Sequence, residues 1–207
     1  MYTYDALRPH IDTGDLILFS GKGGLSAGIK WLTRSRWSHI GMALRLPEWD
    51  VVLIWESTLL NDIEDIELGG IRQGVQLSPL SQRIAAYEGD VAIRHLDVKR
   101  TPAMLAALNA LRQEVKGRPY EKSHLQLLKS TYDGPLGDNE DDISSLFCSE
   151  LVAEAYQRMG LLPELPPPSE YTPKDFSEAH GLALLKGRLG PELSVRRHEP
   201  AGLQRNR

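Results

Sequence analysis

The sequence predicts a single domain of the α+β class, in which an antiparallel sheet or partial barrel packs against helices. Two neighbouring runs rich in strand-forming residues, 37–46 and 50–57, are separated by a short turn, as in a hairpin. Apolar residues recur at helical spacing later in the chain, over 101–116 and again from Phe147 onward. The length of 207 residues is enough for one domain with a sizeable core.

The composition argues against several classes of protein. A net charge of −4 offers no general attraction for nucleic acid. No apolar segment approaches the roughly 20 residues that cross a bilayer, and residues 1–10 lack the basic start and apolar run of a signal peptide. A single cysteine excludes an internal disulfide. We therefore expect a cytoplasmic protein with no transmembrane segment and no nucleic-acid partner, and the sequence leaves its oligomeric state open.

Strands dominate the first half of the chain. Residues 14–20 form the first predicted strand, which ends in the glycine-rich turn 21–24. This turn lacks the glycine and Lys-Ser/Thr spacing of a phosphate-binding loop, so we assign it no nucleotide. The other elements expected before residue 100, besides the hairpin, are a helix over 25–34, a strand near 74–77, a helix over 79–87 and a strand over 90–96.

Helices and loops dominate the second half. Thr101 and Pro102 fit the cap and the first position of the helix over 101–116. The acidic stretch 134–144 is predicted to be a loop, and it lacks the glycine and the terminal glutamate of a calcium loop. We therefore expect no metal ion and no cofactor. The remaining segments expected are a helix around 124–129, an extended linker over 165–169, the start of a short helix at 171–176 and a frayed tail over 196–207.

The only cysteine, Cys148, lies where the sequence predicts the start of a helix. Ser144 or Ser145 can cap the first free backbone N–H groups. The apolar residues that then recur at helical spacing are Phe147, Leu151, Val152, Ala155 and Met159. In the first turn, free N–H groups and the positive end of the helix dipole favour a thiolate, which is the nucleophilic form. A lone cysteine is more often a small buried hydrophobic residue, so partners elsewhere must decide between the two interpretations.

The predicted hairpin supplies two such partners. If its turn is centred after Pro47, His39 lies directly opposite Glu56 on the neighbouring strand. A loop longer by two residues keeps both on one face as diagonal neighbours, whereas a slip of one residue puts them on opposite faces. Gly41 and Ala43 share the face of His39, and we expect the Cys148 helix to approach closely there.

These residues can supply the parts of a thiol-dependent hydrolytic site. Such a site needs a thiolate, an imidazole that activates it and later protonates the leaving group, a group that orients the imidazole, and donors for the oxyanion. Cys148 would attack, His39 would act as base and then as acid, and Glu56 would accept a hydrogen bond from the far ring nitrogen. The backbone N–H of Cys148, together with a side-chain donor, would hold the oxyanion.

The same residues carry a resemblance to a known family. The motifs are Gly14-Asp15-Leu16-Ile17, then Trp37-Ser38-His39-Ile40-Gly41-Met42, a strand that ends in Glu56, and Phe147-Cys148-Ser149-Glu150-Leu151-Val152. In this order the chain resembles the circularly permuted NlpC/P60 group of papain-like enzymes, closest to its YiiX-like branch, and more distantly lecithin retinol acyltransferase. In unpermuted members the cysteine helix precedes the histidine strand, whereas here His39 precedes Cys148.

The resemblance implies a site and a domain arrangement. Cys148, His39 and Glu56 match the family's catalytic triad. Tyr120, in the run Gly117-Arg118-Pro119-Tyr120, resembles a tyrosine found near the cysteine and is the expected side-chain donor. Residues 1–180 would form the permuted catalytic domain, and 181–207 would be a C-terminal extension that is partly flexible.

Three functions follow from these residues as alternatives. The leading one is a cysteine hydrolase that cleaves an amide through a thioester acyl-enzyme, and the resemblance implies a cell-wall peptide as substrate. The second is a lipid acyltransferase or lipid hydrolase of the lecithin retinol acyltransferase type, although the sequence shows no membrane anchor. The third is an inactive binding module, in which Cys148 is an ordinary thiol out of reach of His39.

Overall fold

The computed structural model describes residues 1–21, 35–119 and 140–196, and for residues 140–146 it describes the backbone only. The helices predicted over 25–34 and around 124–129 lie outside these ranges. Within them, the prediction of a mixed α+β architecture with a large antiparallel sheet is confirmed.

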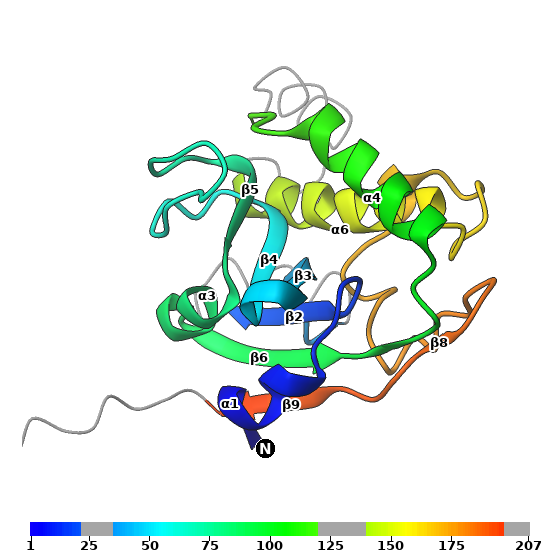
Figure 1. Cartoon of the computed structure of the whole chain (residues 1–207), viewed down its shortest axis with the longest axis horizontal. Helices are drawn as coiled ribbons and strands as arrows, with labels where there is room; N and C mark the ends of the chain where they lie inside the picture. The colour runs from blue at the N-terminus through cyan, green and yellow to red at the C-terminus, as the bar shows by residue number, and fades with distance from the viewer. Residues whose placement is uncertain (22–34, 120–139, 197–207) are drawn as a thin grey trace, which may run out of the picture.

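The sheet contains strands from both ends of the chain (Figure 1). The described strands are β1 (Tyr2–Thr3), β2 (Leu16–Gly21), β3 (His39–Leu46), β4 (Val51–Thr58), β5 (Gly74–Pro79), β6 (Gly89–Arg94), β7 (Leu96–Asp97), β8 (Arg188–Leu189) and β9 (Leu193–Arg196). Seven of them form one sheet in the order β1-β9-β6-β2-β3-β4-β5, and β7 pairs with β8. Neighbours in the large sheet are antiparallel, except that β1 and β9 are parallel. The predicted strands over 14–20, 74–77 and 90–96 and the hairpin are confirmed.

Four described α-helices surround the sheet: α1 (Tyr4–Leu7), α3 (Leu80–Ala86), α4 (Pro102–Val115) and α6 (Glu140–Arg158). Short 3-10 turns lie at Arg8–His10, Pro47–Trp49 and Pro168–Glu170. The hydroxyl of Thr101 accepts a hydrogen bond from the N–H of Met104, and Pro102 is the first helical residue, as predicted for α4. The predicted helix at 171–176 is wrong: the segment forms turns, in which Asp175 accepts hydrogen bonds from the N–H and hydroxyl of Thr172.

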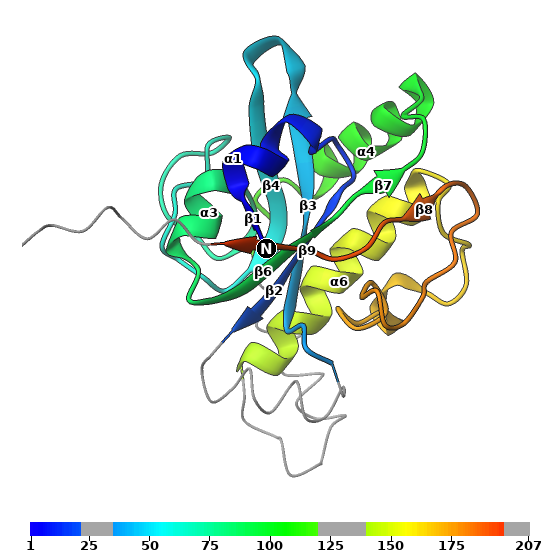
Figure 2. The same cartoon turned by 90° about the horizontal axis from the view of Figure 1, so that it is seen from below.

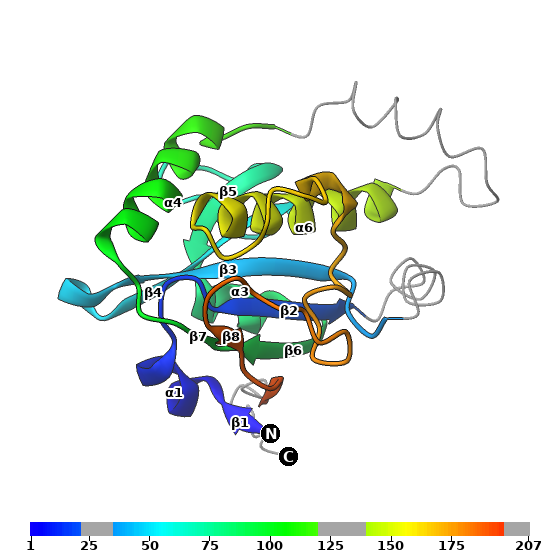
Figure 3. The same ribbon diagram turned by 90° about the vertical axis from the view of Figure 1, so that its right-hand side faces the viewer.

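Strand alternation divides the core into two layers, one on each face of the sheet (Figure 3). Apolar residues of one face pack with α4 and α6; examples are Ile40, Met42 and Trp55 with Val152 and Tyr156. Apolar residues of the other face pack with α1 and α3; examples are Phe19 and Ile54 with Leu7, Leu80 and Ile84. The hydroxyl of Tyr156 donates to the carbonyl of Gly14 at 2.7 Å, which fixes α6 to the start of β2.

The turn of the β3–β4 hairpin decides the position of the predicted partners. Pro47–Trp49 forms a 3-10 turn and Asp50 follows in the left-handed conformation with φ of 49°. Met42 therefore pairs with Trp55, which shifts the register by two residues from the centred turn. The prediction that His39 directly faces Glu56 is wrong, and the alternative of diagonal neighbours on one face is confirmed.

The last described residues belong to the body of the domain (Figure 2). β9 pairs with β6 on one side and with β1 on the other. The segment beyond residue 180 thus adds a strand to the large sheet and joins the two ends of the described chain.

Candidate active site

Three of the four predicted site residues lie together. Nε2 of His39 and Oε2 of Glu56 are 2.6 Å apart, and both residues are buried. His39 also forms a side-chain hydrogen bond with Cys148. Because Nε2 is used by Glu56, we infer that Nδ1 is the ring nitrogen that faces the sulfur. Tyr120, the predicted side-chain donor, lies outside the described residues.

The predicted position of Cys148 in the first turn of its helix is wrong. Helix α6 begins at Glu140, so Cys148 lies about two turns into it. Ser144 and Ser145 are interior residues of the helix and cannot be its N-caps. The predicted loop over 134–144 overlaps the start of this helix, because residues 140–144 contain a single apolar residue, Ile143, and four polar ones. The helix dipole acts mainly within the first turn, so stabilisation of a thiolate must come from a side chain.

The helix position also removes a predicted oxyanion donor. In an α-helix each N–H bonds to the carbonyl four residues earlier, so the N–H of Cys148 is directed at the carbonyl of Ser144. A free N–H at the nucleophile would require the helix to begin there. The oxyanion in any acyl transfer at this site would therefore depend on side-chain donors.

The Cys148 helix approaches β3 from the face opposite to the predicted one. The helix packs on the face of the sheet that carries Ile40 and Met42. The Cβ position of Gly41 lies on the opposite face, next to the side chains of β4. A Cβ added at Gly41 would lie 2.7 Å from Cδ1 of Ile54 and 3.2 Å from Cβ of Glu56, so this glycine makes room for the strand that carries Glu56. His39 is the first residue of β3, at the end of the strand, where its ring contacts groups from both layers.

The electrostatics favour a charged His39. Burial alone would lower the pKa of His39, but the charge and hydrogen bond of Cys148, followed by those of Glu56, raise it to about 9. Burial alone would raise the pKa of Glu56, but the charge of Arg83 and then the hydrogen bond and charge of His39 lower it below its ordinary value. At neutral pH the site therefore holds an imidazolium and a carboxylate. An imidazolium beside a cysteine sulfur favours the thiolate.

Arg83 is a component that the sequence analysis missed. Its Nε donates to Oε1 of Glu56 at 2.6 Å, and its Nη1 donates to Oδ1 of Asp62 at 2.6 Å. Arg83 and Glu56 are both 0% exposed. A signal was present in the sequence: in the predicted helix 79–87, Arg83 lies next to Ile84 and three residues after Leu80, which puts a cation on the apolar face.

Aromatic rings enclose the other side of the imidazole. The ring centroids of Phe19 and His39 are 5.3 Å apart, and those of Phe19 and Tyr87 are 4.8 Å apart. Burial raises the pKa of Tyr87 to about 12, opposed by its hydrogen bond with Ser38 and reinforced by the charges of Glu56 and Cys148. Tyr87 is therefore a neutral phenol at physiological pH.

A pocket of about 350 Å³ lies between α4, α6 and the β4–β5 edge. Its lining combines apolar residues, among them Leu111, Val115 and Leu151, with the charged residues Glu114, Arg118, Glu150 and Glu154. Two more lining residues adjoin the triad along the chain: Phe147 precedes Cys148, and Ser57 follows Glu56. Cys148 itself is 0% exposed, so attack on a substrate requires that the groups covering the sulfur move.

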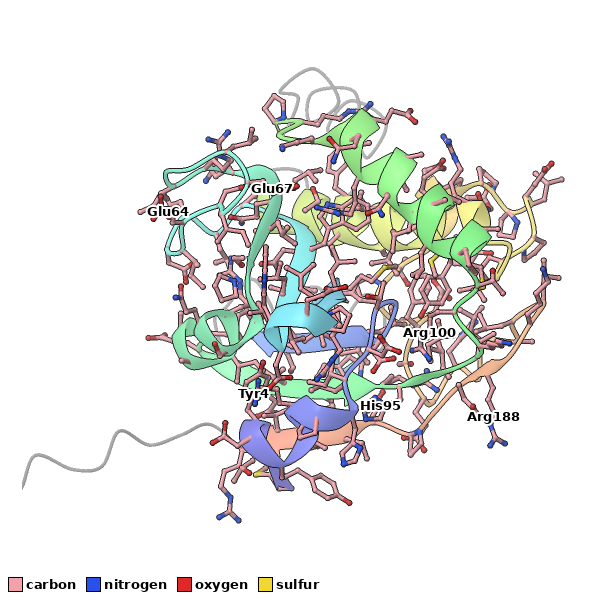
Figure 4. The ribbon with its side chains drawn as sticks, viewed as in Figure 1. Tyr4, Glu64, Glu67, His95, Arg100 and Arg188 are labelled. Atoms are coloured by element: carbon pink, nitrogen blue, oxygen red, sulfur yellow. The ribbon has the colours of Figure 1, made fainter. Side chains whose placement is uncertain are left out.

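A second histidine–carboxylate pair lies elsewhere and contains no sulfur. Nδ1 of His95 is 2.6 Å from Oδ2 of Asp15, whose other oxygen accepts from Nη2 of Arg100 at 2.8 Å and from the N–H of Leu96 at 2.9 Å. Figure 4 shows His95 and Arg100 where β6 leads toward α4. This cluster ties β2 to the segment that precedes α4, and we assign it a structural role.

The side chains of the described residues include no group of three or more His, Cys, Asp or Glu placed to hold a metal ion. None of the helices in the described ranges is long and apolar enough to cross a membrane.

Comparisons with protein-family models and with curated proteins find no match. Among solved structures, the chain is similar to the metalloprotein yiiX from Escherichia coli O157:H7, with 18% sequence identity and a TM-score of 0.47. The alignment covers 92% of this chain and 99% of that chain. At this level of similarity, the function has to be argued from the site itself.

Proposed function

We propose that the protein is a cysteine hydrolase that cleaves an amide bond, with Cys148 as nucleophile, His39 as general base and acid, and Glu56 as the residue that orients His39. The observation that carries the proposal is the buried imidazole of His39, hydrogen-bonded to Cys148 on one side and to Glu56 on the other. A merely structural cysteine needs neither an imidazole nor an acidic partner behind it.

The proposed reaction has two steps. The thiolate of Cys148 attacks the carbonyl carbon, and the imidazolium of His39 gives its proton to the leaving amine as the carbon–nitrogen bond breaks. This leaves a thioester on Cys148 and a neutral imidazole. His39 then takes a proton from water, the hydroxide attacks the thioester, and the carboxylic acid leaves as the sulfur regains its negative charge. Glu56 stays ionised throughout and stabilises each imidazolium.

We also propose that the domain is a circularly permuted relative of the papain-like NlpC/P60 group, of the YiiX-like branch. The support is the chain order, histidine strand before cysteine helix, and the packing of α6 against an antiparallel sheet that carries His39 and Glu56. In this proposal the substrate is a peptide or another small amide, with a cell-wall peptide as the class that the family suggests.

Alkylation of Cys148 tests the nucleophile without knowledge of the substrate. Labelling by iodoacetamide, followed by mass spectrometry, is expected to proceed at about pH 6 in the wild type, because His39 is protonated there and stabilises a thiolate. In His39→Ala the rate at this pH should fall by roughly tenfold or more. His95→Ala is the matched control and should react like the wild type.

The opposite outcome would leave Cys148 as a buried structural thiol. In that outcome, the alkylation rate of both the wild type and His39→Ala rises only near pH 8.5, which is about the ordinary pKa of a free thiol. The lipid alternative predicts a further result, in which an acyl chain lies against Leu111, Val115 and Leu151 in the lining of the pocket. Incubation with phospholipid vesicles would then leave a hydroxylamine-sensitive acyl group on Cys148, which a peptide amidase should not acquire.

A further inference from the structure

We propose that Arg83 is a positioning residue of this site, which keeps Glu56 ionised and fixed so that Glu56 holds His39 as an imidazolium directed at Cys148. The inference deepens the proposed cysteine hydrolase function and rests on it.

The geometry gives each oxygen of Glu56 a separate cationic partner. Oε1 accepts from Nε of Arg83 and Oε2 faces Nε2 of His39, both at 2.6 Å. A carboxylate held at both oxygens cannot rotate, so the plane of the imidazole is fixed from behind. Asp62 holds the far side of the guanidinium at 2.6 Å through Nη1. The contacts thus run from Asp62 on a surface loop through Arg83, Glu56 and His39 to Cys148.

The burial makes the arginine necessary for the charge of Glu56. A carboxylate with no exposed surface and no cation beside it becomes protonated, because desolvation penalises its charged form. His39 is a weaker source of positive charge for Glu56 than Arg83 is, because the charge of His39 itself depends in part on Glu56. An arginine keeps its charge at every physiological pH and fits a carboxylate with a directed N–H. Consistent with this, the charge of Arg83 is the largest cause that lowers the pKa of Glu56.

The groups that determine the titration of His39 come from every described element around it. Cys148 faces it from α6, Glu56 from β4, and Tyr87 lies beyond Phe19 after α3. Arg83 acts on His39 through Glu56, and Asp62 is the outermost group. Of these cations and anions, only Arg83 has a charge that is fixed over the whole accessible pH range.

A structural role would also explain a buried ion pair, since Arg83 joins α3 to β4. The two roles differ in what they do to the site. A structural role predicts lower stability with an unchanged pH profile at Cys148. A positioning role predicts that the low-pH reactivity of Cys148 falls even in folded protein, because a neutral Glu56 no longer stabilises the imidazolium.

The test measures the rate of iodoacetamide alkylation of Cys148 against pH. Arg83→Met is expected to weaken the low-pH reactive form, with a rate at about pH 6 lower by roughly tenfold and between those of the wild type and His39→Ala. Arg83→Lys keeps the charge and should retain most of the rate, and Asp62→Asn leaves the Arg83–Glu56 contact in place and should do the same. Arg100→Met is the matched control, because Arg100 binds the buried Asp15 beside His95.

A double-mutant cycle keeps the proposal testable if Arg83→Met folds poorly. Glu56→Gln with Arg83→Met removes both buried charges. If Arg83 acts through Glu56, this double variant should have the same alkylation profile as Glu56→Gln alone. The proposal would be overturned if Arg83→Met lowered the alkylation rate equally in the wild type and in Glu56→Gln. It would also be overturned if folded Arg83→Met kept the wild-type pH profile of alkylation.

One further arm separates this inference from the proposed function. In the Cys148→Ala background, NMR titration of His39 should show a lower pKa when Arg83 is replaced by Met, because the imidazolium has lost its ionised partner. A wild type without low-pH alkylation, together with this shift, would refute the hydrolase and retain the role of Arg83. If the pKa of His39 is the same with Arg83 and with Met at this position, the role of Arg83 is refuted and the hydrolase proposal is unaffected.

Discussion

At the scale of single residues, the charge of His39 couples the site to the stability of the fold. The pKa of His39 rises from its ordinary value of 6.5 to about 9 in the folded protein. A raised pKa means that the charged form stabilises the fold fully below about pH 6.5, and that this contribution is lost as the pH rises through about 9. The site should therefore make the protein less stable in mild alkali.

Urea unfolding across this range checks that coupling. As the pH rises from about 8.5, where the thiol of the unfolded chain ionises, to about 9, the wild type is expected to lose on the order of 1 kcal/mol of unfolding free energy that His39→Gln does not lose. Between about pH 6.5 and 8.5 the wild type should change little, because folding has already removed a proton from Cys148 and this offsets the proton that the unfolded histidine releases. Parallel pH dependences in the wild type and His39→Gln would contradict the charged histidine.

At the scale of elements, the two-residue period of side chains along a strand made it predictable that His39 and Glu56 share a face. It did not determine which residues of the two strands pair. Side chains alternate along each strand, so any even shift in register preserves the face. The shift of two residues came from Asp50, whose left-handed conformation extends the turn, and nothing in the local pattern required that conformation. The sequence thus predicted the contact between the two side chains but not its diagonal geometry.

The helix that carries Cys148 shows a different limit of sequence reasoning. Apolar spacing marks where a helix packs, and it predicted the buried half of α6, whose core residues include Cys148, Leu151 and Val152. Its first turns are polar, and a polar helical turn has the same composition as a loop. Arg83 was missed because burial of a cation is unusual and only its partner, from a strand distant in sequence, makes it acceptable.

Gly41 tests how tightly the two hairpin strands must approach for the site to form. In Gly41→Ala the new Cβ would press on Ile54 and Glu56, so we expect a loss of about 1–3 kcal/mol in unfolding free energy. Alkylation of Cys148 at about pH 6 should slow as Glu56 is displaced. Gly190→Ala is the control, because its nearest neighbour atom is 3.5 Å away, and it should unfold like the wild type.

At the scale of the whole molecule, the 350 Å³ pocket joins segments from three regions of the chain. Leu111 and Val115 come from α4, Leu151 from α6 and Ser57 from β4, so no local pattern in the sequence indicates it. Phe147 and Ser57, which also line it, precede Cys148 and follow Glu56 in the sequence. If the proposed hydrolase function holds, this pocket is the candidate for binding the apolar part of the acyl group.

Filling the pocket should therefore change the choice of acyl group and leave the nucleophile intact. Val115→Trp occupies part of the 350 Å³, so its acylation by p-nitrophenyl octanoate should fall by roughly tenfold or more while acylation by p-nitrophenyl acetate stays nearly unchanged. Burst kinetics of nitrophenol release measure both. Ala110→Trp, on the exposed side of the same helix, is the matched control and should keep the wild-type preference. An equal loss with both esters would mean that the substitution disturbs Cys148 itself, and no loss with either would place the acyl group elsewhere.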